Sequence, residues 1–290
     1  MNIECVVKSK DRVGEVPVWC DRSHKVWWID VRQPRIQSFY PECGSHEVFL
    51  VEGKAIGSYA LRESGGMILA QEDGIHLYDP ATKSRSMLLE LEGDIEVNRL
   101  NDGRCDRRGR FWLGSMNDTV REPDGSFYSV SADLEVQKWF GDINIPNGVA
   151  FSPDDTVLYF ADTPAQKIWA FDFDLEEGRI SNRRLFADLA GNPGRPDGST
   201  VDAQGFLWNA EFNGKRVVRY TPDGRIDRVI DMPVTNNTCL GFGGPDLSLL
   251  YVTTAWQGLS EEKRVQEPLA GGLFCLDVGI KGLPEPRFAG

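Results

Sequence analysis

Six segments of this sequence carry a polar or small residue at one equivalent position, four residues before the apolar end of an expected strand. These residues are Glu15, Gly57, Asn101, Asn147, Asp197 and Thr238. Four of the six are Glu, Asn or Asp, whose carboxylate and amide oxygens are the ligands that a hard divalent cation takes. Glu is a poor turn residue, so the need for a bend does not explain the set. The pattern suggests a cation site, and the alternative is a group of polar side chains hydrogen-bonded to water.

Arg99 lies two residues before Asn101, in the segment NRLNDG. The fixed fork of donors on a guanidinium suits a carboxylate or the hydroxyls of a small polar substrate. A salt bridge to one of the many acidic residues is the alternative. The neighbouring Asn101 favours the substrate interpretation.

The sequence contains few residues that suit other kinds of catalysis. The only histidines are His24, His46 and His76, and none stands at the equivalent position. This argues against a Ser-His-Asp or Cys-His nucleophile and against a His-rich zinc site. There is no G-x-x-x-x-G-K-[ST] segment and no G-x-G-x-x-G segment after a strand, so a nucleotide-phosphate cradle is not expected. A metal held by few oxygen ligands would keep open positions at which chemistry can occur.

The elements that position these residues repeat along the chain. A turn followed by a short hydrophobic strand appears in DRSHKVWWID, RESGGMILAQ, DRRGRFWLGS, SPDDTVLYFAD, DAQGFLWNAE and GPDLSLLYVTT. A second strand follows each copy, and a further strand follows five of them. Helical periodicity is almost absent, and the period is about 41 to 50 residues. Four short strands per period predict an all-β fold, a six-bladed β-propeller of antiparallel strands.

The sixth repeat has only a weak candidate for its last strand, EPRFAG at residues 285–290. The unassigned run IECVVKS, residues 3–9, could supply that strand and close the propeller. A solenoid or a two-sheet sandwich could share the strand count, but a strand left over at the N-terminus favours closure. We expect one domain over residues 1–290, in which the equivalent positions converge at one height around the central axis.

The composition limits the classes of binding partner that we expect. A net charge of −12 argues against nucleic acid or an anionic membrane, because binding to phosphate relies on Lys and Arg. No apolar run reaches membrane-spanning length, and the N-terminus lacks a secretory signal. Six scattered cysteines without a C-x-x-C pair suit a reducing compartment, so we expect a cytoplasmic protein. The sequence does not indicate an oligomeric state.

Four motifs then carry a resemblance to a known family. They are GEVPVW (14–19), NRLNDG (98–103), PNGVAFSPD (146–154) and RPDGSTVDAQG (195–205). Together they resemble the SMP-30/gluconolactonase/regucalcin family of six-bladed propeller lactonases, and the resemblance covers essentially the whole chain. It implies one divalent metal held by Glu15, Asn147 and Asp197, with Arg99 and Asn101 in contact with the substrate.

One segment departs from the family pattern. Some members place a substrate-contacting Glu shortly after a G-[ST]-M run, whereas this chain has Asn117, Asp118 and Thr119 there. The substrate preference of relatives therefore does not carry over.

The resemblance implies hydrolysis of a sugar-acid lactone, such as arabinono-, xylono-, glucono- or galactonolactone, to the aldonic acid. Asp197 is the best candidate for the general base, and a metal-bound hydroxide is the competing nucleophile. Arg99 and Asn101 would orient the sugar hydroxyls. The sequence leaves Ca²⁺, Mg²⁺, Mn²⁺ and Zn²⁺ open as the cation. The alternatives are a non-catalytic calcium-binding or protein-interaction propeller, and a metal-dependent esterase or phosphotriesterase.

Overall fold

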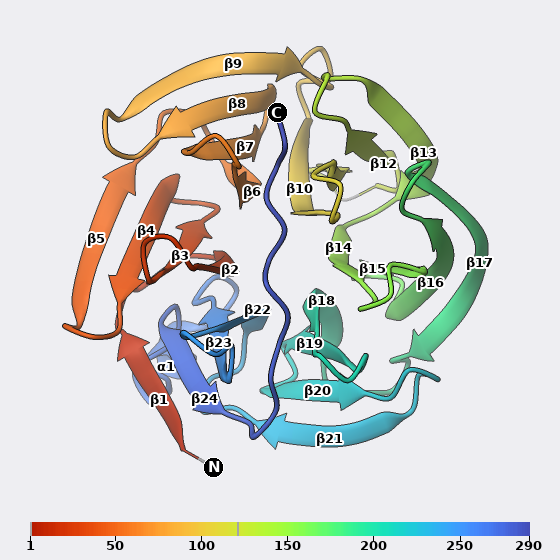
Figure 1. The fold of residues 1–290 in the computed structure, drawn as a ribbon. Coiled ribbons are helices and arrows are strands. Elements are labelled where there is room, and N and C mark those ends of the chain that lie inside the picture. Colours follow the sequence, from red (N-terminus) through yellow and green to blue (C-terminus); the bar gives the residue numbers. More distant parts are fainter. Residues whose placement is uncertain (1, 121) are drawn as a thin grey trace. The chain divides into compact units, whose positions relative to one another are not determined.

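A computed structural model describes residues 2–120 and 122–290. Short strands dominate these residues, which form six four-stranded antiparallel sheets and one short helix (Figure 1). Each sheet is one blade, so the expected fold class, an all-β six-bladed β-propeller, is confirmed. The described residues divide into two compact units. The prediction of a single domain over residues 1–290 stays a prediction.

Unit 1 combines the chain up to Val51 with Leu189–Pro284 and contains three sheets. Their strands, in sheet order, are β2 (Gly14–Cys20), β3 (Lys25–Asp30), β4 (Arg35–Tyr40) and β5 (Ser45–Leu50); β18 (Arg195–Val201), β19 (Leu207–Phe212), β20 (Arg216–Tyr220) and β21 (Ile226–Asp231); and β22 (Asn237–Gly243), β23 (Leu249–Thr254), β24 (Leu273–Asp277) and β1 (Ile3–Val7). The helix α1 (Glu261–Gln266) lies between β23 and β24.

Unit 2 combines Glu52–Asp188 with Glu285–Gly290 and contains the other three sheets. Their strands are β6 (Ile56–Leu61), β7 (Met67–Gln71), β8 (Gly74–Asp79) and β9 (Ser84–Glu90); β10 (Asn98–Cys105), β11 (Phe111–Asn117), β12 (Gly125–Val130) and β13 (Val136–Ile143); and β14 (Pro146–Phe151), β15 (Val157–Asp162), β16 (Lys167–Asp174) and β17 (Arg179–Asp188).

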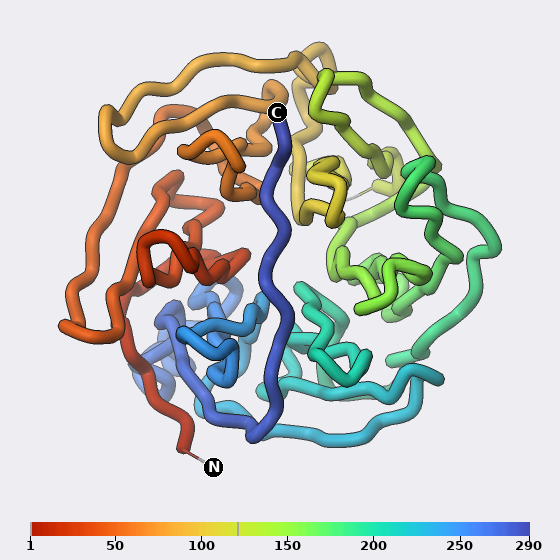
Figure 2. Tube along the Cα trace, viewed as in Figure 1, coloured from red at the N-terminus to blue at the C-terminus, as the bar shows by residue number. Residues whose placement is uncertain are grey.

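The N-terminal run completes the last sheet of unit 1, as the sequence predicts. Strand β1 pairs antiparallel with β24, with Ile3 opposite Leu276 (Figure 2). The weaker candidate, residues 285–290, does not form that strand. It lies in unit 2, where the Phe288 amide donates to the Leu61 carbonyl at 2.8 Å and the Phe288 ring is fully buried.

A β-bulge marks the equivalent position in every sheet. The pairing of the first strand with the second shifts register at Glu15/Val18, Ile56/Ser58, Leu100/Gly103, Asn147/Ala150, Pro196/Ser199 and Asn237/Cys239. All six residues singled out in the sequence therefore stand at or inside a bulge. A bulge changes the direction in which a side chain points. The equivalent position in the sequence is therefore the position of a bulge in the first strand of each sheet.

Two hairpins explain why the D-x-x-G-x-x-W segments fold as they do. The Asp202 carboxylate accepts hydrogen bonds from the backbone amides of Gln204 and Phe206 and from the Trp208 indole at 2.8 Å. Gly205 has a φ of +83°, which a glycine adopts without strain. Asp106 makes the equivalent contacts in unit 2, so this Asp fixes the turn and also the large aromatic residue behind it.

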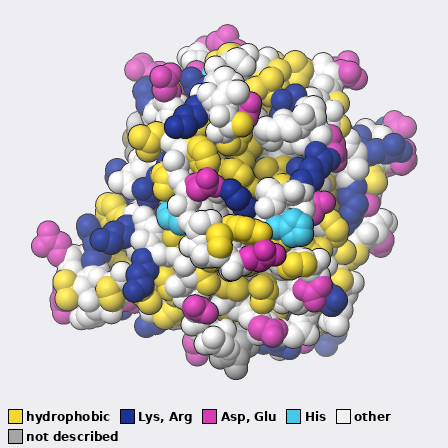
Figure 3. Space-filling view, turned by 60° about the vertical axis from the view of Figure 1, so that its left-hand side comes forward, with side chains coloured by type: hydrophobic (Ala, Val, Ile, Leu, Met, Phe, Trp, Pro, Cys, Tyr) yellow, Lys and Arg dark blue, Asp and Glu magenta, His cyan; other side chains and the backbone are white. Residues whose placement is uncertain are grey.

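Buried apolar side chains form clusters within each unit. In unit 2 one cluster includes Trp112, Phe127 and Phe160, and in unit 1 another includes Trp208 and Phe274. No helix among the described residues is long and apolar enough to cross a membrane. On the face that Figure 3 shows, acidic and basic side chains are interspersed.

Candidate metal and substrate site

Unit 2 brings three of the predicted site residues together. Arg99 Nη1 donates to Asn101 Oδ1 at 2.6 Å, and Asn101 Nδ2 donates to Asn147 Oδ1 at 3.1 Å. The Pro146 carbonyl accepts a second hydrogen bond from Asn101 Nδ2 at 2.8 Å. All three polar side chains are buried. The neighbouring strands β10 and β14 thus hold an ordered array of one guanidinium and two amides.

The amide of Asn147 has a fixed orientation. Its Nδ2 donates to Thr163 Oγ1 at 2.8 Å, which directs Oδ1 away from Thr163. An amide whose nitrogen is held in this way presents its oxygen as an acceptor. This is the arrangement that a metal-ligating Asn requires.

Arg99 is held from two sides. In addition to its bond to Asn101, its Nε donates to Asp118 Oδ1 at 2.9 Å and its Nη1 donates to the Leu100 carbonyl at 3.0 Å. The salt bridge considered as the alternative for Arg99 therefore exists, and it coexists with the contact to Asn101. Asp118 belongs to the segment that departs from the family pattern, so that segment positions a predicted substrate-binding residue.

We expect the Asp118→Asn variant to lower kcat/KM for the substrate by about fivefold, because an ion pair that is partly open to solvent contributes up to about 1 kcal/mol. Its KM should rise by a larger factor than its kcat falls, since the proposed role of Arg99 is to bind the substrate and not to take part in the bond changes. Steady-state kinetics of the purified variant give both constants. Glu122→Gln, a change of an exposed residue in the same segment, serves as the control. Equal kinetic constants for the two variants would show that Asp118 does not position Arg99 for substrate binding.

Unit 1 holds the two predicted carboxylate ligands on strands that both contact β22. On one side, Thr238 Oγ1 donates to the carbonyl of Gly14, the residue before Glu15, at 2.5 Å. On the other side, a Cβ on Gly198, the residue after Asp197, would stand 2.3 Å from Cys239 Sγ. The glycine lets β18 approach β22 closely. Glu15 and Asp197 therefore lie on strands that flank Thr238.

The backbone around Asp197 is fixed by a buried amide. Asn209 Nδ2 donates to the Asp197 carbonyl at 2.9 Å and to Ser199 Oγ at 2.9 Å. Asp197 itself is 6% exposed. Its position in β18 is thus set by the second strand of the same sheet.

A buried carboxylate beside the array was not singled out in the sequence. Asp102 follows Asn101 and accepts hydrogen bonds from the amides of Gly103 and Val149, at 2.9 and 3.3 Å, so it links β10 to β14. Burial raises the pKa of Asp102 to about 6. Its place in the NRLNDG motif is the available signal, but Asp before Gly is also a common turn pair, so the sequence alone does not single it out.

Among residues 2–120 and 122–290, no three His, Cys, Asp or Glu side chains form a group that could hold a metal. The predicted ligands differ from such a group, because one of them is the amide of Asn147. Glu15 and Asp197 belong to unit 1, and Asn147 belongs to unit 2.

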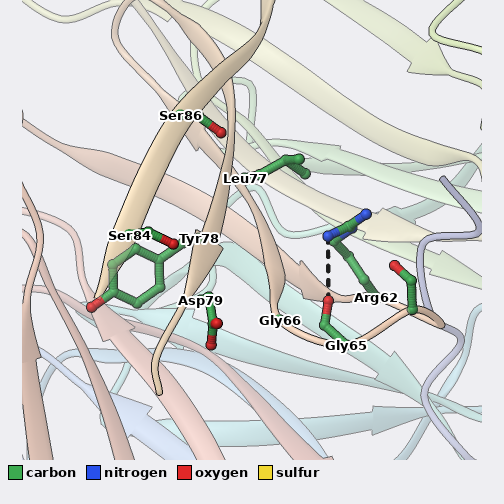
Figure 4. Close-up of a pocket in the computed structure, with 9 residues that line it drawn as sticks. Arg62, Gly65, Gly66, Leu77, Tyr78, Asp79, Ser84 and Ser86 are labelled. Carbon is green, nitrogen blue, oxygen red and sulfur yellow. Dashed lines mark hydrogen bonds between the residues drawn. The ribbon is translucent and has the colours of Figure 1, made fainter. Parts of the chain in front are cut away.

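A separate pocket of about 490 Å³ lies in unit 2 and contains none of the predicted site residues (Figure 4). It is lined by Arg62, Ser64, Gly65, Gly66, Leu77, Tyr78, Asp79, Ser84 and Ser86. Arg62 Nη1 donates to the Gly65 carbonyl at 3.3 Å, and Nε donates to the Gly290 carbonyl. The Arg62 guanidinium, which lines this pocket, thus binds the backbone carbonyls of Gly65 and Gly290.

Comparison with known proteins places this propeller in a family. Residues 13–256 match the SMP-30/gluconolactonase/LRE-like region. The chain is 37% identical over 289 residues to a 6-deoxy-6-sulfogluconolactonase from Pseudomonas putida, with 99% of each chain covered. It is 35% identical over 297 residues to a regucalcin from Xenopus laevis, covering all of this chain and 99% of the relative.

A solved structure supports the same assignment. A calcium-binding protein, regucalcin, from Agrobacterium tumefaciens matches with a TM-score of 0.94 and 32% identity, covering 98% of this chain and 96% of that one. The fold and the motifs define a β-propeller of the lactonase class. The chain belongs to the SMP-30/gluconolactonase/LRE-like family, as the four motifs predict, and the expectation of a lactonase-type enzyme is confirmed at that level.

Proposed function

We propose that the protein is a metal-dependent hydrolase that opens a sugar-acid lactone to the corresponding aldonic acid. The observation that carries the proposal is the buried array of Arg99, Asn101 and Asn147, which combines a guanidinium of a type suited to sugar hydroxyls with a fixed amide oxygen. The kinship with a sulfogluconolactonase supports the substrate class. The expected cytoplasmic localisation is part of this proposal.

The residues present fit a divalent cation. Asn147 has its nitrogen engaged by Thr163, so its oxygen is the atom available to a metal. Glu15 and Asp197 supply carboxylates, and a set of two carboxylates and one amide oxygen suits Ca²⁺ as well as Mg²⁺, Mn²⁺ or Zn²⁺. We therefore propose Glu15, Asn147 and Asp197 as the ligands of one cation. When bound, the cation supplies Lewis-acid polarisation of a carbonyl oxygen.

The residues of the chain provide the remaining chemistry. Asp197 takes a proton from the attacking water, whose oxygen forms a bond to the lactone carbonyl carbon. The bond from that carbon to the ring oxygen then breaks, and the ring oxygen leaves as a hydroxyl after it receives the proton held by Asp197. Arg99 donates to hydroxyls of the sugar, and Asn101 Oδ1, which accepts one hydrogen bond from Arg99, has a second lone pair for another.

A panel of aldonolactones tests this function. The protein is stripped of metal and assayed with arabinono-, xylono-, glucono- and galactonolactone, with each cation added back in turn. We expect hydrolysis above the spontaneous rate only with a cation present. A protein that opens no lactone with any cation would contradict the proposal.

Calcium binding without catalysis is the second candidate, because the solved relative is described as a calcium-binding protein. The same panel separates the two functions. Binding of Ca²⁺ with no lactone hydrolysis under any condition would favour this candidate over the lactonase.

A further inference from the structure

Thr163 lies beside the proposed metal ligand Asn147, although it stands outside the four motifs of the sequence. It follows β15, and its Oγ1 accepts the hydrogen bond from Asn147 Nδ2 at 2.8 Å. Thr163 is 7% exposed and Asn147 is 6% exposed. Because the bond is shielded from water, its loss would cost more than the loss of a hydrogen bond at the surface.

Backbone contacts fix the place of this hydroxyl. The Thr163 amide donates to the carbonyl of Ile145, two residues before Asn147, at 3.1 Å. The Asp162 carboxylate accepts hydrogen bonds from the amides of Asn144 and Ile145, at 3.3 and 3.2 Å. The end of β15 therefore holds the segment that leads into β14, and the hydroxyl meets Asn147 from a fixed position.

The hydrogen bonds that reach Asn147 run in one direction. The Arg99 guanidinium can only donate, so the atom of Asn101 that faces it at 2.6 Å is Oδ1. Asn101 Nδ2 is then the atom that faces Asn147 and the Pro146 carbonyl, which can only accept. Asn147 therefore receives this bond on Oδ1 and donates to Thr163 with Nδ2.

The orientation of the Asn147 amide decides whether it can be a ligand. An amide oxygen coordinates a hard cation, whereas an amide NH2 group points its hydrogens outward and does not. Oδ1 has two lone pairs, and one remains for a cation after the bond from Asn101. The terminal torsion of an Asn side chain is soft, so an acceptor for Nδ2 is needed to keep the oxygen in place. Thr163 supplies that acceptor.

We infer that Thr163 is a positioning residue for the cation, because its hydroxyl stabilises the orientation in which Asn147 presents Oδ1 as a ligand. This inference rests on the proposed cation site. It adds a residue that touches neither the cation nor the lactone and acts through Asn147. Partners that hydrogen-bond to a metal ligand contribute about 10- to 100-fold to metal affinity.

Calorimetric titration of metal-stripped protein with Ca²⁺ and with Zn²⁺ tests this role without an activity assay. Thr163→Val keeps the shape of the side chain and removes the hydroxyl. We expect it to lower cation affinity by about tenfold or more. Thr163→Ser keeps the hydroxyl and should recover most of the wild-type affinity.

Ser152→Ala provides the matched control for the loss of a buried hydroxyl. Ser152 is also 7% exposed, and its Oγ accepts hydrogen bonds from the amides of Thr156 and Val157, at 3.2 and 3.0 Å. It follows β14 at the end remote from Asn147. Thr163→Val and Ser152→Ala should both lower the unfolding midpoint of the metal-free protein, and only Thr163→Val should lower cation affinity.

A second background shows whether the orientation of the amide is the cause. In Asn147→Asp both terminal atoms of the side chain are oxygens, so an oxygen faces the cation in either orientation. Thr163→Val should therefore lower cation affinity much less in the Asn147→Asp background than in the wild type. The difference measures the coupling between the two residues.

The outcomes separate this inference from the lactonase function. Unchanged cation affinity in Thr163→Val, no recovery in Thr163→Ser, an equal loss in Ser152→Ala, or an equal effect in both backgrounds would each overturn the role of Thr163. If the affinities follow the predictions but the protein opens no lactone, the lactonase fails and the role of Thr163 is supported. If the wild-type protein binds no cation, the cation site and the role of Thr163 fail together.

Discussion

We expect the replacement of Asp197 by Asn to lower kcat for lactone hydrolysis by about 10²- to 10⁴-fold, the contribution of a positioned general base. The variant should keep much of its affinity for the cation, because an amide oxygen is still a ligand for a hard metal. The side chain remains similar in size and shape, so the fold around the buried position is preserved. Steady-state kinetics and calorimetric titration with the cation measure the two effects separately.

A surface carboxylate provides the control for this substitution. Asp223→Asn changes an exposed residue of the β20–β21 hairpin in the same unit and should leave both kcat and metal affinity unchanged. Near-normal turnover in Asp197→Asn would contradict the assignment of Asp197 as the base. Loss of both turnover and metal binding would reduce its role to that of a ligand.

Replacement of Asp202 by Ala should lower the free energy of unfolding by about 3–5 kcal/mol. Asp202 is fully buried and accepts hydrogen bonds from the Trp208 indole and from Arg219 Nε at 2.9 Å. Arg219 is only 4% exposed; the substitution removes its fully buried carboxylate partner and leaves Asp227, at 2.8 Å, as the remaining one. Thermal and denaturant unfolding of the variant and the wild type measure the difference.

Two comparisons make this prediction specific. Asp106→Ala removes the equivalent carboxylate in unit 2, which also holds a tryptophan indole, and should destabilise the protein as well. Asp223→Ala, at an exposed hairpin, should change the unfolding midpoint little. Unaltered unfolding in Asp202→Ala would show that the hairpin does not depend on its buried carboxylate.

The repeated elements were predictable from the sequence because each blade is built from local signals. Turn residues and short apolar runs recur with a regular period, and the leftover N-terminal run has an unpaired edge to join at β24. The equivalent position could be aligned because the same bulge recurs in each first strand. The residues at 285–290 could not be placed, since their backbone pairs with Leu61 and Gly109 far away in the sequence.

The candidate site was only partly predictable. Residue types and family motifs identified Arg99, Asn101 and Asn147, which the structure brings into one hydrogen-bonded array. They did not predict the contact between Asp118 and Arg99, which joins β10 to the segment after β11. Contacts between segments that are distant in sequence depend on packing, and no local pattern reports them.

The binding of one cation per chain is the most direct test of the central claim, that Glu15, Asn147 and Asp197 hold the metal on which lactone hydrolysis depends. Metal-stripped protein is titrated with Ca²⁺ and with Zn²⁺, and lactonase activity is followed in the same samples. We predict one binding site per chain, activity that rises in proportion to its occupancy, and a large loss of affinity in Glu15→Ala and Asn147→Ala. Full lactonase activity in protein that holds no cation, or unchanged affinity in both variants, would contradict the account.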